Sequence, residues 1–342
     1  MLDLLLKNGN IIDGSGNPSY IGDIGIKENR IKEIGTLKKR ASEVLDIRGL
    51  SVSPGFIDTH SHSDLFLIHD PDSLPKIMQG ITTEILGQDG LGEAPISQKQ
   101  KDEWRKYLSG LNGDPPIEWN WENFSEYLNV LSQSKPSVNI ASLVGHGNLR
   151  LLTIGMENRR PSYSELEHMK QLLRESLESG AIGMSTGLIY APCVYSDTKE
   201  LIDLCRVVTE YSGVFVVHMR DEGDHLLESI DEVLLIAEES GVHTHISHFK
   251  AGGKNNWGKS KQALEKLEKS KANGIQVSYD QYPYTAGSTF LSSLLPSWVH
   301  EGGIDKLIER LEKSEIRNKI SKEYLTLEES GRATSWDRVL VT

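Results

Sequence analysis

Two histidines, His60 and His62, follow an apolar run that begins at Pro54. The run predicts a β-strand, in which residues i and i+2 point to the same side, so both imidazoles can face one point. Imidazole is a common ligand of zinc and similar metals. A chance pair of histidines is the alternative, but a position at the end of a strand favours a metal site.

Two further histidines end apolar runs: His218 closes the run from Gly213, and His248 closes the run from His243. A single histidine at such a place is more often a structural hydrogen-bonding residue. Four histidines at the ends of three strands, however, converge if the strands form one barrel, whose active-site mouth lies at the strands' C-terminal ends. Alternation puts His248 on one face of its strand and His243 and His245 on the other. We favour His248 because it lies nearest the strand's end.

A carboxylate can join these imidazoles. Asp89 lies in the turn from Gly87 to Gly90, directly after the second predicted strand. It can be a metal ligand or the aspartate of an ordinary Asp-Gly turn, and the spacing favours neither interpretation.

After residue 50 the predicted elements alternate between strand and helix, which is typical of a parallel sheet with right-handed crossovers. Seven strand-like runs lie at 51–58, 82–87, 138–144, 181–185, 214–218, 243–248 and 276–280. Helices are expected at 164–179, 196–211, 226–240, 260–273 and 304–322. The pattern predicts an α/β fold, a (β/α)8 TIM-like barrel that is incomplete, with about seven of its strands. The last segment, 336–342, can be a further strand.

The first fifty residues have a different pattern. Short apolar or alternating runs at 2–7, 9–12, 21–27 and 30–34 are separated by turn signals such as Asn8-Gly9 and Asp13-Gly14. We therefore expect two domains, a small β domain at 1–50 and the barrel at 51–342.

A series of short motifs carries a family resemblance. Gly9, Asp13-Gly14 and the segment that ends in His60-x-His62 resemble the opening of amidohydrolase-superfamily enzymes. Segments at 80–83, 145–150, 180–190, 218–220, 247–250 and 282–289 resemble the N-acyl-D-amino-acid deacylases, or D-aminoacylases, in particular. The resemblance covers nearly the whole chain.

That resemblance implies a distorted (β/α)8 barrel that carries the site, and a small β-sandwich domain built from both chain ends. It implies one or two zinc ions bound by His60, His62, Asp89, His218 and His248. The family commonly has cysteine at the position of Asp89. Because a carboxylate is a harder ligand than a thiolate, the metal preference of this chain can differ. Cys193, in the loop after the fourth strand, is better interpreted as a structural cysteine than as a replacement ligand.

The implied reaction is hydrolysis of the amide bond of an N-acyl-D-amino acid, which releases a D-amino acid and a carboxylate. By resemblance the substrate is held by Lys250, Tyr282, Ser288 and Tyr190, and ammonium and hydroxyl groups suit its carboxylate. His146 ends a strand and either lines the site or packs in its turn. The family's general base, an aspartate on the eighth strand, is expected beyond residue 342. We therefore expect the chain to be truncated, with no catalytic base of its own and little hydrolysis if it is complete.

Two other functions stay open: a non-catalytic metal-binding fragment, and a cyclic-amide hydrolase such as a hydantoinase or dihydroorotase. The latter usually bridges two metals with a carboxylated lysine. Lys250 is the lysine near a predicted ligand, and it suits the substrate better.

Composition excludes several classes of partner. The net charge of −12 argues against non-specific nucleic-acid binding. No apolar run approaches the roughly 20 residues of a membrane helix. Two cysteines and a poor signal peptide predict a reduced, cytoplasmic protein whose partner is a small-molecule substrate.

Overall fold

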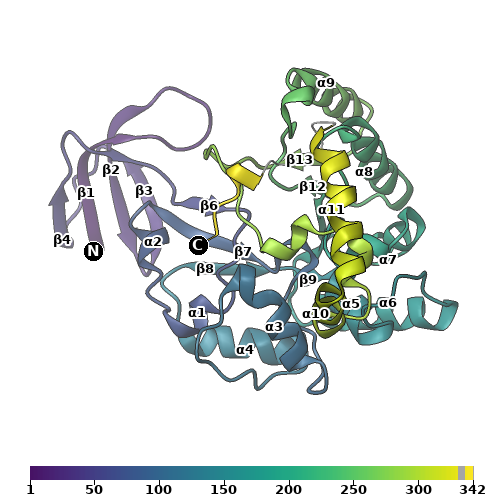
Figure 1. The fold of residues 1–342 in the computed structure, drawn as a ribbon. Helices are drawn as coiled ribbons and strands as arrows, with labels where there is room; N and C mark the ends of the chain where they lie inside the picture. Colours follow the sequence, from purple (N-terminus) through teal and green to yellow (C-terminus); the bar gives the residue numbers. More distant parts are fainter. Residues whose placement is uncertain (330–335, 342) are drawn as a thin grey trace. The chain divides into compact units, whose positions relative to one another are not determined.

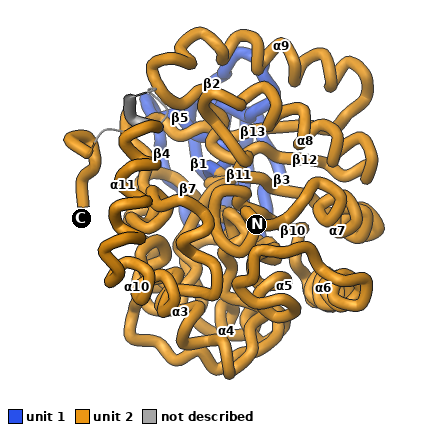
Figure 2. Tube along the Cα trace, turned by 45° about the vertical axis from the view of Figure 1, so that its right-hand side comes forward, with its two compact units in different colours: residues 1–56 blue, residues 57–342 orange. Residues whose placement is uncertain are grey.

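The computed structural model describes residues 1–329 and 336–341 and separates into two compact units, Met1–Phe56 and Ile57–Thr342 (Figures 1 and 2). Five strands of the first unit form one mixed sheet in the order β3-β2-β1-β4, with β5 beside β1. β1 and β2 are antiparallel, as are β2 and β3, whereas β4 and β5 run parallel to β1. Their bounds are β1 Leu2–Ile11, β2 Tyr20–Lys27, β3 Arg30–Gly35, β4 Ala41–Asp46 and β5 Ser51–Val52.

Three strand predictions near the N-terminus need correction. The runs at 2–7 and 9–12 are one strand, β1, which continues through a shift in its pairing with β2 between Leu6 and Gly9. β4 was not predicted. The run at 51–58 is two strands: β5 pairs with β1, and β6 (Phe56–Asp58) pairs with β7 (Ile81–Leu86). Pro54 lies between them and has no N–H to donate to a ladder, so the extended run divides there.

The strands of the second unit occupy the seven predicted positions. Two paired runs have the orders β6-β7-β8 and β13-β12-β11-β10-β9. The third predicted strand is interrupted at Leu143, so that its first half pairs with β7 and its second half with β10. The remaining bounds are β8 Asn139–Ser142, β9 Val144–Gly145, β10 Gly183–Gly187, β11 Val214–His218, β12 His243–Ile246 and β13 Val277–Tyr279.

Helices follow the strands and lie outside them (Figure 1). Local signals explain their ends: Ser162 and Glu165 form a capping box at the start of α6, and Gly241, with φ +71°, ends α8. The four helices predicted between strands are α6 to α9. The bounds are α1 Phe66–His69, α2 Leu74–Ile77, α3 Lys101–Asn112, α4 Phe124–Ser134, α5 His146–Thr153, α6 Tyr163–Glu178, α7 Thr198–Glu210, α8 Leu226–Ser240 and α9 Lys259–Ala272.

A continuous apolar core joins these helices to the strands. Phe215 and Val217 of β11, Leu204 of α7 and Val233 of α8 are fully buried members of one cluster. Full burial of such a side chain contributes about 1.5–3 kcal/mol. The strand ends that carry the candidate ligands therefore rest on a packed layer.

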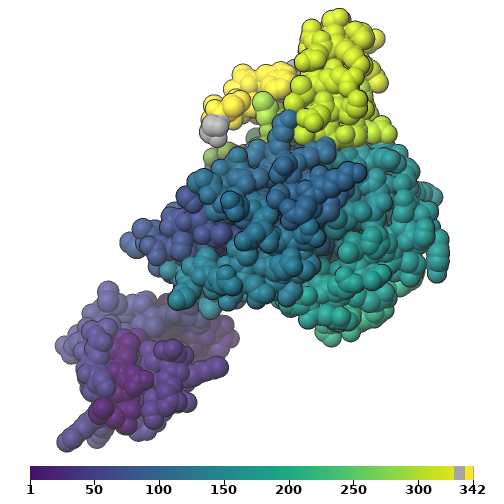
Figure 3. Space-filling view, turned by 90° about the horizontal axis from the view of Figure 1, so that it is seen from below, coloured from purple at the N-terminus to yellow at the C-terminus, as the bar shows by residue number. Residues whose placement is uncertain are grey.

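The helix predicted at 304–322 is wrong as a single element. It is two helices, α10 (Ile304–Glu312) and α11 (Ser314–Glu329), with an extended Lys313 between them. The Arg317 guanidinium donates to the carbonyls of Leu311 (2.7 Å) and Glu312 (2.8 Å), which satisfies the C-terminal end of α10. Lys106 of α3 pairs with Asp305 of α10. In Figure 3, α10 and α11 (yellow-green) adjoin the blue segment that contains α3.

The strand considered for 336–342 is also wrong for its described part, since Trp336–Arg338 is a short 3₁₀ helix. Thr342 lies outside the described residues. Across residues 1–329 and 336–341, no helix has the length and apolar character needed to cross a membrane.

Candidate metal centre

The turn after β7 presents Asp89. Gly87 and Gly90 have φ values of +71° and +74°, and Asp89 itself has φ +58°, a region that aspartate tolerates better than most residues. A Cβ at Gly87 would lie 2.2 Å from the carbonyl oxygen of Leu143, so only glycine fits there. The turn directs the Asp89 carboxylate inward, where the residue is 4% exposed.

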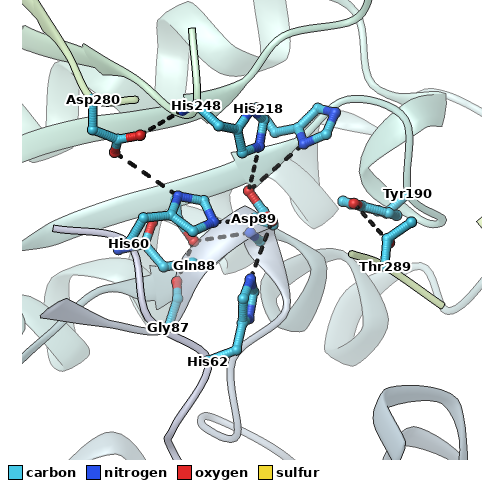
Figure 4. Close-up of polar contacts among 12 residues, drawn as sticks. His60, His62, Gly87, Gln88, Asp89, Tyr190, His218, His248, Asp280 and Thr289 are labelled. Carbon is cyan, nitrogen blue, oxygen red and sulfur yellow. Dashed lines mark hydrogen bonds and ion pairs between the residues drawn. The ribbon is translucent and has the colours of Figure 1, made fainter. Parts of the chain in front are cut away.

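Four imidazoles surround this carboxylate (Figure 4). The Nε2 atoms of His60 and His62 lie 3.4 Å and 3.3 Å from Asp89 Oδ2. On the other side, His218 Nδ1 and His248 Nε2 lie 3.8 Å and 3.9 Å from Asp89 Oδ1. The structure therefore brings together all five residues predicted as ligands, with one histidine pair at each carboxylate oxygen.

The atoms of this cluster fit a metal centre. His60, His62 and Asp89 offer donor atoms that lie within 4.8 Å of one another, and so do Asp89, His218 and His248. Several of the buried polar atoms have no hydrogen-bond partner, among them Asp89 Oδ1 and His218 Nδ1. Because such orphaned atoms are rare in folded proteins, a bound cation is a direct explanation for them. The imidazole and carboxylate set suits zinc.

Electrostatics favour the charged form of Asp89 and the neutral form of His218. Burial opposes ionisation of Asp89, but the imidazoles of His60 and His62 outweigh it and hold the pKa of this carboxyl well below its usual range. Burial lowers the pKa of His218 to about 4. A neutral imidazole is the form that binds metals, so His218 needs no deprotonation at neutral pH.

Asp280 contacts two of the candidate ligands and was missed by the sequence analysis. It follows β13, and its Oδ1 accepts a hydrogen bond from the backbone N–H of His248 (2.5 Å). Its Oδ2 lies 2.9 Å from His245 Nε2 and 3.9 Å from His60 Nδ1. The signal was available, since Asp280 ends a predicted strand in the same way as the histidines do.

The alternation argument for the His243–His248 run needs correction. β12 ends at Ile246, and His248 has φ +37°, so the period of two does not reach it. His245 points to Ser278 and Asp280. His243 is exposed, and its ring lies 3.1 Å from the Ser278 hydroxyl.

Lys250 and Tyr282 lie beside the imidazoles, at a cavity of about 250 Å³ that they line together with His248 and Gln281. The Lys250 ammonium pairs with Glu222 (2.6 Å), another residue that the sequence analysis missed, and lies 5.6 Å from the centre of the Tyr282 ring. A cation and a phenol at one cavity suit a carboxylate ligand.

The other two predicted substrate residues are placed differently. The lining of this cavity extends to Gly287, one residue before the exposed Ser288. Tyr190 is buried, packs edge-on against the His218 ring, and forms a hydrogen bond with Thr289 (3.0 Å). Burial raises the pKa of the Tyr190 hydroxyl, so it stays protonated.

His146 does not face Asp89. It is fully buried, with one ring nitrogen 2.9 Å from the Thr186 hydroxyl and the other 2.8 Å from Glu200. Arg150 donates to both oxygens of Glu200 (2.8 and 2.6 Å). Cys193 is a free thiol that lies against Gly90 rather than in either ligand group. The packing interpretations of His146 and Cys193 match this placement.

A model of the amidohydrolase family matches residues 43–313. The chain belongs to the amidohydrolase family. Its sequence is 39% identical over 290 residues to the D-aminoacylase of Alcaligenes xylosoxydans xylosoxydans, a match that covers 84% of this chain and 59% of that protein. The family resemblance inferred from the motifs is thus confirmed.

Two solved structures are similar to this amidohydrolase. One is a D-aminoacylase studied for its binuclear metal centre (TM-score 0.77, 37% identity, 84% of this chain and 60% of that one). The other is an N-acyl-D-glutamate deacylase from Bordetella bronchiseptica with zinc and a phosphonate mimic of the tetrahedral intermediate (TM-score 0.76, 36% identity, 83% and 59%). These matches confirm the amidohydrolase barrel fold. The chain spans less than two thirds of the length of these relatives.

The buried network behind the amidohydrolase site predicts a large effect on stability. Burial opposes ionisation of Glu200, but the His146 ring and the Arg150 guanidinium hold the pKa of this carboxyl below its usual value, so Glu200 is the buried partner of both side chains. Glu200→Gln is expected to lower the free energy of unfolding by about 3–5 kcal/mol. Urea unfolding followed by circular dichroism measures it. Glu167→Gln, at a part-exposed pair with Lys170, is the control and should cost less than about 1 kcal/mol.

Proposed function

We propose that this chain carries the zinc site of an enzyme that hydrolyses the amide bond of N-acyl-D-amino acids. The convergence of two histidine pairs on the two oxygens of Asp89, beside a cavity that Lys250 lines, carries the proposal. The names of the similar proteins, D-aminoacylase and N-acyl-D-glutamate deacylase, support the substrate class. Two free buried thiols agree with a reducing, cytoplasmic location, which we include in the proposal.

We assign the metal ligands to five residues at the mouth formed by the strand ends. The Asp89 carboxylate is shared between the two histidine pairs. The donor sets allow one or two zinc ions. Zinc bound there would polarise the scissile carbonyl and lower the pKa of an attacking water. The ligands are His60, His62, Asp89, His218 and His248.

The remaining residues bind and orient the substrate in this proposal. Lys250 and Tyr282 hold the carboxylate at the cavity they line, and Ser288 binds from the adjoining loop. Tyr190 supports the ring of His218 and reaches the same loop through Thr289. An ammonium–carboxylate contact is a charge-assisted hydrogen bond, worth about twice a neutral one.

Among the described residues we assign no general base. Asp280 accepts bonds from the His248 backbone and pairs with His245, and Glu222 is held by His248 and Lys250. Both carboxylates are therefore engaged as supports of other side chains.

Hydrolysis of N-acetyl-D-leucine by the zinc-loaded protein tests the function. Because no general base is assigned among the described residues, we expect only slow release of D-leucine, which stops on chelation and recovers on adding zinc. The rate should be at least about 100-fold lower with the L-enantiomer, a ratio that corresponds to about 2.7 kcal/mol of difference in transition-state binding. Hydrolysis that is insensitive to chelation would contradict the proposal. Stoichiometric zinc binding without any hydrolysis would instead favour the non-catalytic metal-binding protein.

A further inference from the structure

Glu84 of β7 is a buried carboxylate that binds an ammonium and several hydroxyls. Its Oε2 accepts hydrogen bonds from the hydroxyls of Ser61 (2.5 Å) and Ser63, and it lies 3.2 Å from Lys76 Nζ. Its Oε1 accepts a hydrogen bond from the hydroxyl of Ser73 (3.3 Å). A carboxylate accepts about four hydrogen bonds, so these donors satisfy it although its side chain is 0% exposed.

The stretch of backbone that Glu84 binds also carries the first histidine pair. The imidazoles of His60 and His62 face the carboxylate of Asp89. The two serines that alternate with these histidines bind Glu84 instead. The stretch is therefore held between two buried carboxylates, and its hydrogen bonds to Glu84 restrict where the two imidazoles can lie.

Lys76 fixes the start of the same stretch. Its ammonium lies 2.5 Å from Asp58 Oδ2 and 3.0 Å from Ser61 Oγ. The other oxygen of Asp58, Oδ1, accepts a hydrogen bond from the backbone N–H of His60 (3.1 Å). Asp58 and Glu84 thus share one cation, which connects the carboxylate on β7 to the backbone of the first ligand.

Packing alone does not account for a carboxylate at this position of β7. Leu86, two residues further along the strand, lies on the same face and is buried in the apolar core. A buried ion pair commonly adds no more stability than apolar residues of similar volume. Its hydrogen bonds, however, are directional and fix the positions of the groups that donate them. The geometry of the ligand stretch is therefore the property that Glu84 can supply and an apolar side chain cannot.

We propose that Glu84 is a positioning residue for the half of the metal centre that His60 and His62 form. It acts through the hydroxyls of Ser61 and Ser63, which it binds directly. The inference rests on the proposed function, since it takes both histidines as metal ligands. Residues that orient ligands typically change metal affinity by about 10–100-fold, and Glu84 acts through the intervening backbone, so we expect its loss to cost about 10-fold.

Two serine variants separate positioning from packing in the whole protein. Ser61→Ala removes a hydroxyl that joins Glu84 to the ligand stretch, whereas Ser73→Ala removes a hydroxyl that binds the same carboxylate from the residue before α2. Competition with a chromogenic chelator should show zinc binding about 10-fold weaker in Ser61→Ala and in Glu84→Gln, but changed by less than about 2-fold in Ser73→Ala. Glu200→Gln breaks an equally buried ion pair, and it should lower the stability in urea without weakening zinc binding.

Two histidine backgrounds show which half of the centre is affected. His248→Ala leaves the first set of three donors intact, and His62→Ala leaves the second. Adding Ser61→Ala should weaken zinc binding about 10-fold in the first background and less than about 2-fold in the second. A loss of the same size in both backgrounds, or equal effects of Ser61→Ala and Ser73→Ala, would overturn the inference and leave the proposed function standing. If the unaltered protein binds no zinc, the proposed function fails and the inference fails with it.

Discussion

Replacing Asp89 by alanine is expected to remove zinc from both histidine pairs. The two pairs face the two oxygens of this one carboxylate, so its loss leaves each of them with only two nitrogen ligands. Stable zinc sites need three or four protein ligands. At a zinc concentration 100-fold above its dissociation constant, the metal should stabilise the unaltered protein by about 2.7 kcal/mol and Asp89→Ala by almost nothing. Elemental analysis after gel filtration and thermal melts with and without zinc measure this.

Two matched variants separate ligand chemistry from packing. Asp89→Asn keeps the shape but loses the charge, and should bind zinc far more weakly than the unaltered protein. Asp89→Cys restores an anionic ligand of softer character, so it should keep zinc and bind cadmium relatively more tightly. Full zinc stoichiometry in Asp89→Ala would show that the carboxylate is not shared between two sites.

The convergence of the four histidines at one mouth could be predicted because each position follows from a local rule. His60, His62, His218 and His248 all lie at or just after the end of an apolar run, and parallel strands present their ends at one mouth. Asp89 could not be decided in the same way. The direction of the Asp89 side chain depends on the left-handed backbone of its turn and on the close approach of Leu143 to Gly87. Neither feature can be inferred from the spacing of residues in the sequence.

The supporting residues were harder to predict because their roles depend on pairs of distant loops. Glu222 and His248 are 26 residues apart, and their contact exists only because β11 and β12 are neighbours. The errors in the fold have a similar cause. The division at Lys313 depends on Arg317 reaching back to the carbonyls that end α10, which helical periodicity does not report.

Asp280 offers a second test of the site because its carboxylate contacts two of the proposed metal ligands, His248 and His60. Its carboxylate bonds the His248 backbone and lies 3.9 Å from His60 Nδ1, so it links β13 to the segment after β6. Asp280→Asn keeps the volume and one acceptor but loses the charge that faces His60. We expect zinc affinity to fall about 10–100-fold, as for other carboxylates that orient ligating histidines.

Three observations show whether Asp280 acts through the metal site rather than through the fold. Chelator competition should report the weaker zinc binding, while urea unfolding without metal should change by no more than about 1–3 kcal/mol, the cost of a lost buried hydrogen bond. Asp231 is an exposed residue of α8 that pairs with Lys266 of α9, and Asp231→Asn should change neither quantity. Because Asp280 touches one ligand of each histidine pair, both zinc equivalents should weaken together. Weakening of one equivalent alone would mean that Asp280 supports a single pair, and the link between β13 and the other pair would have to be abandoned.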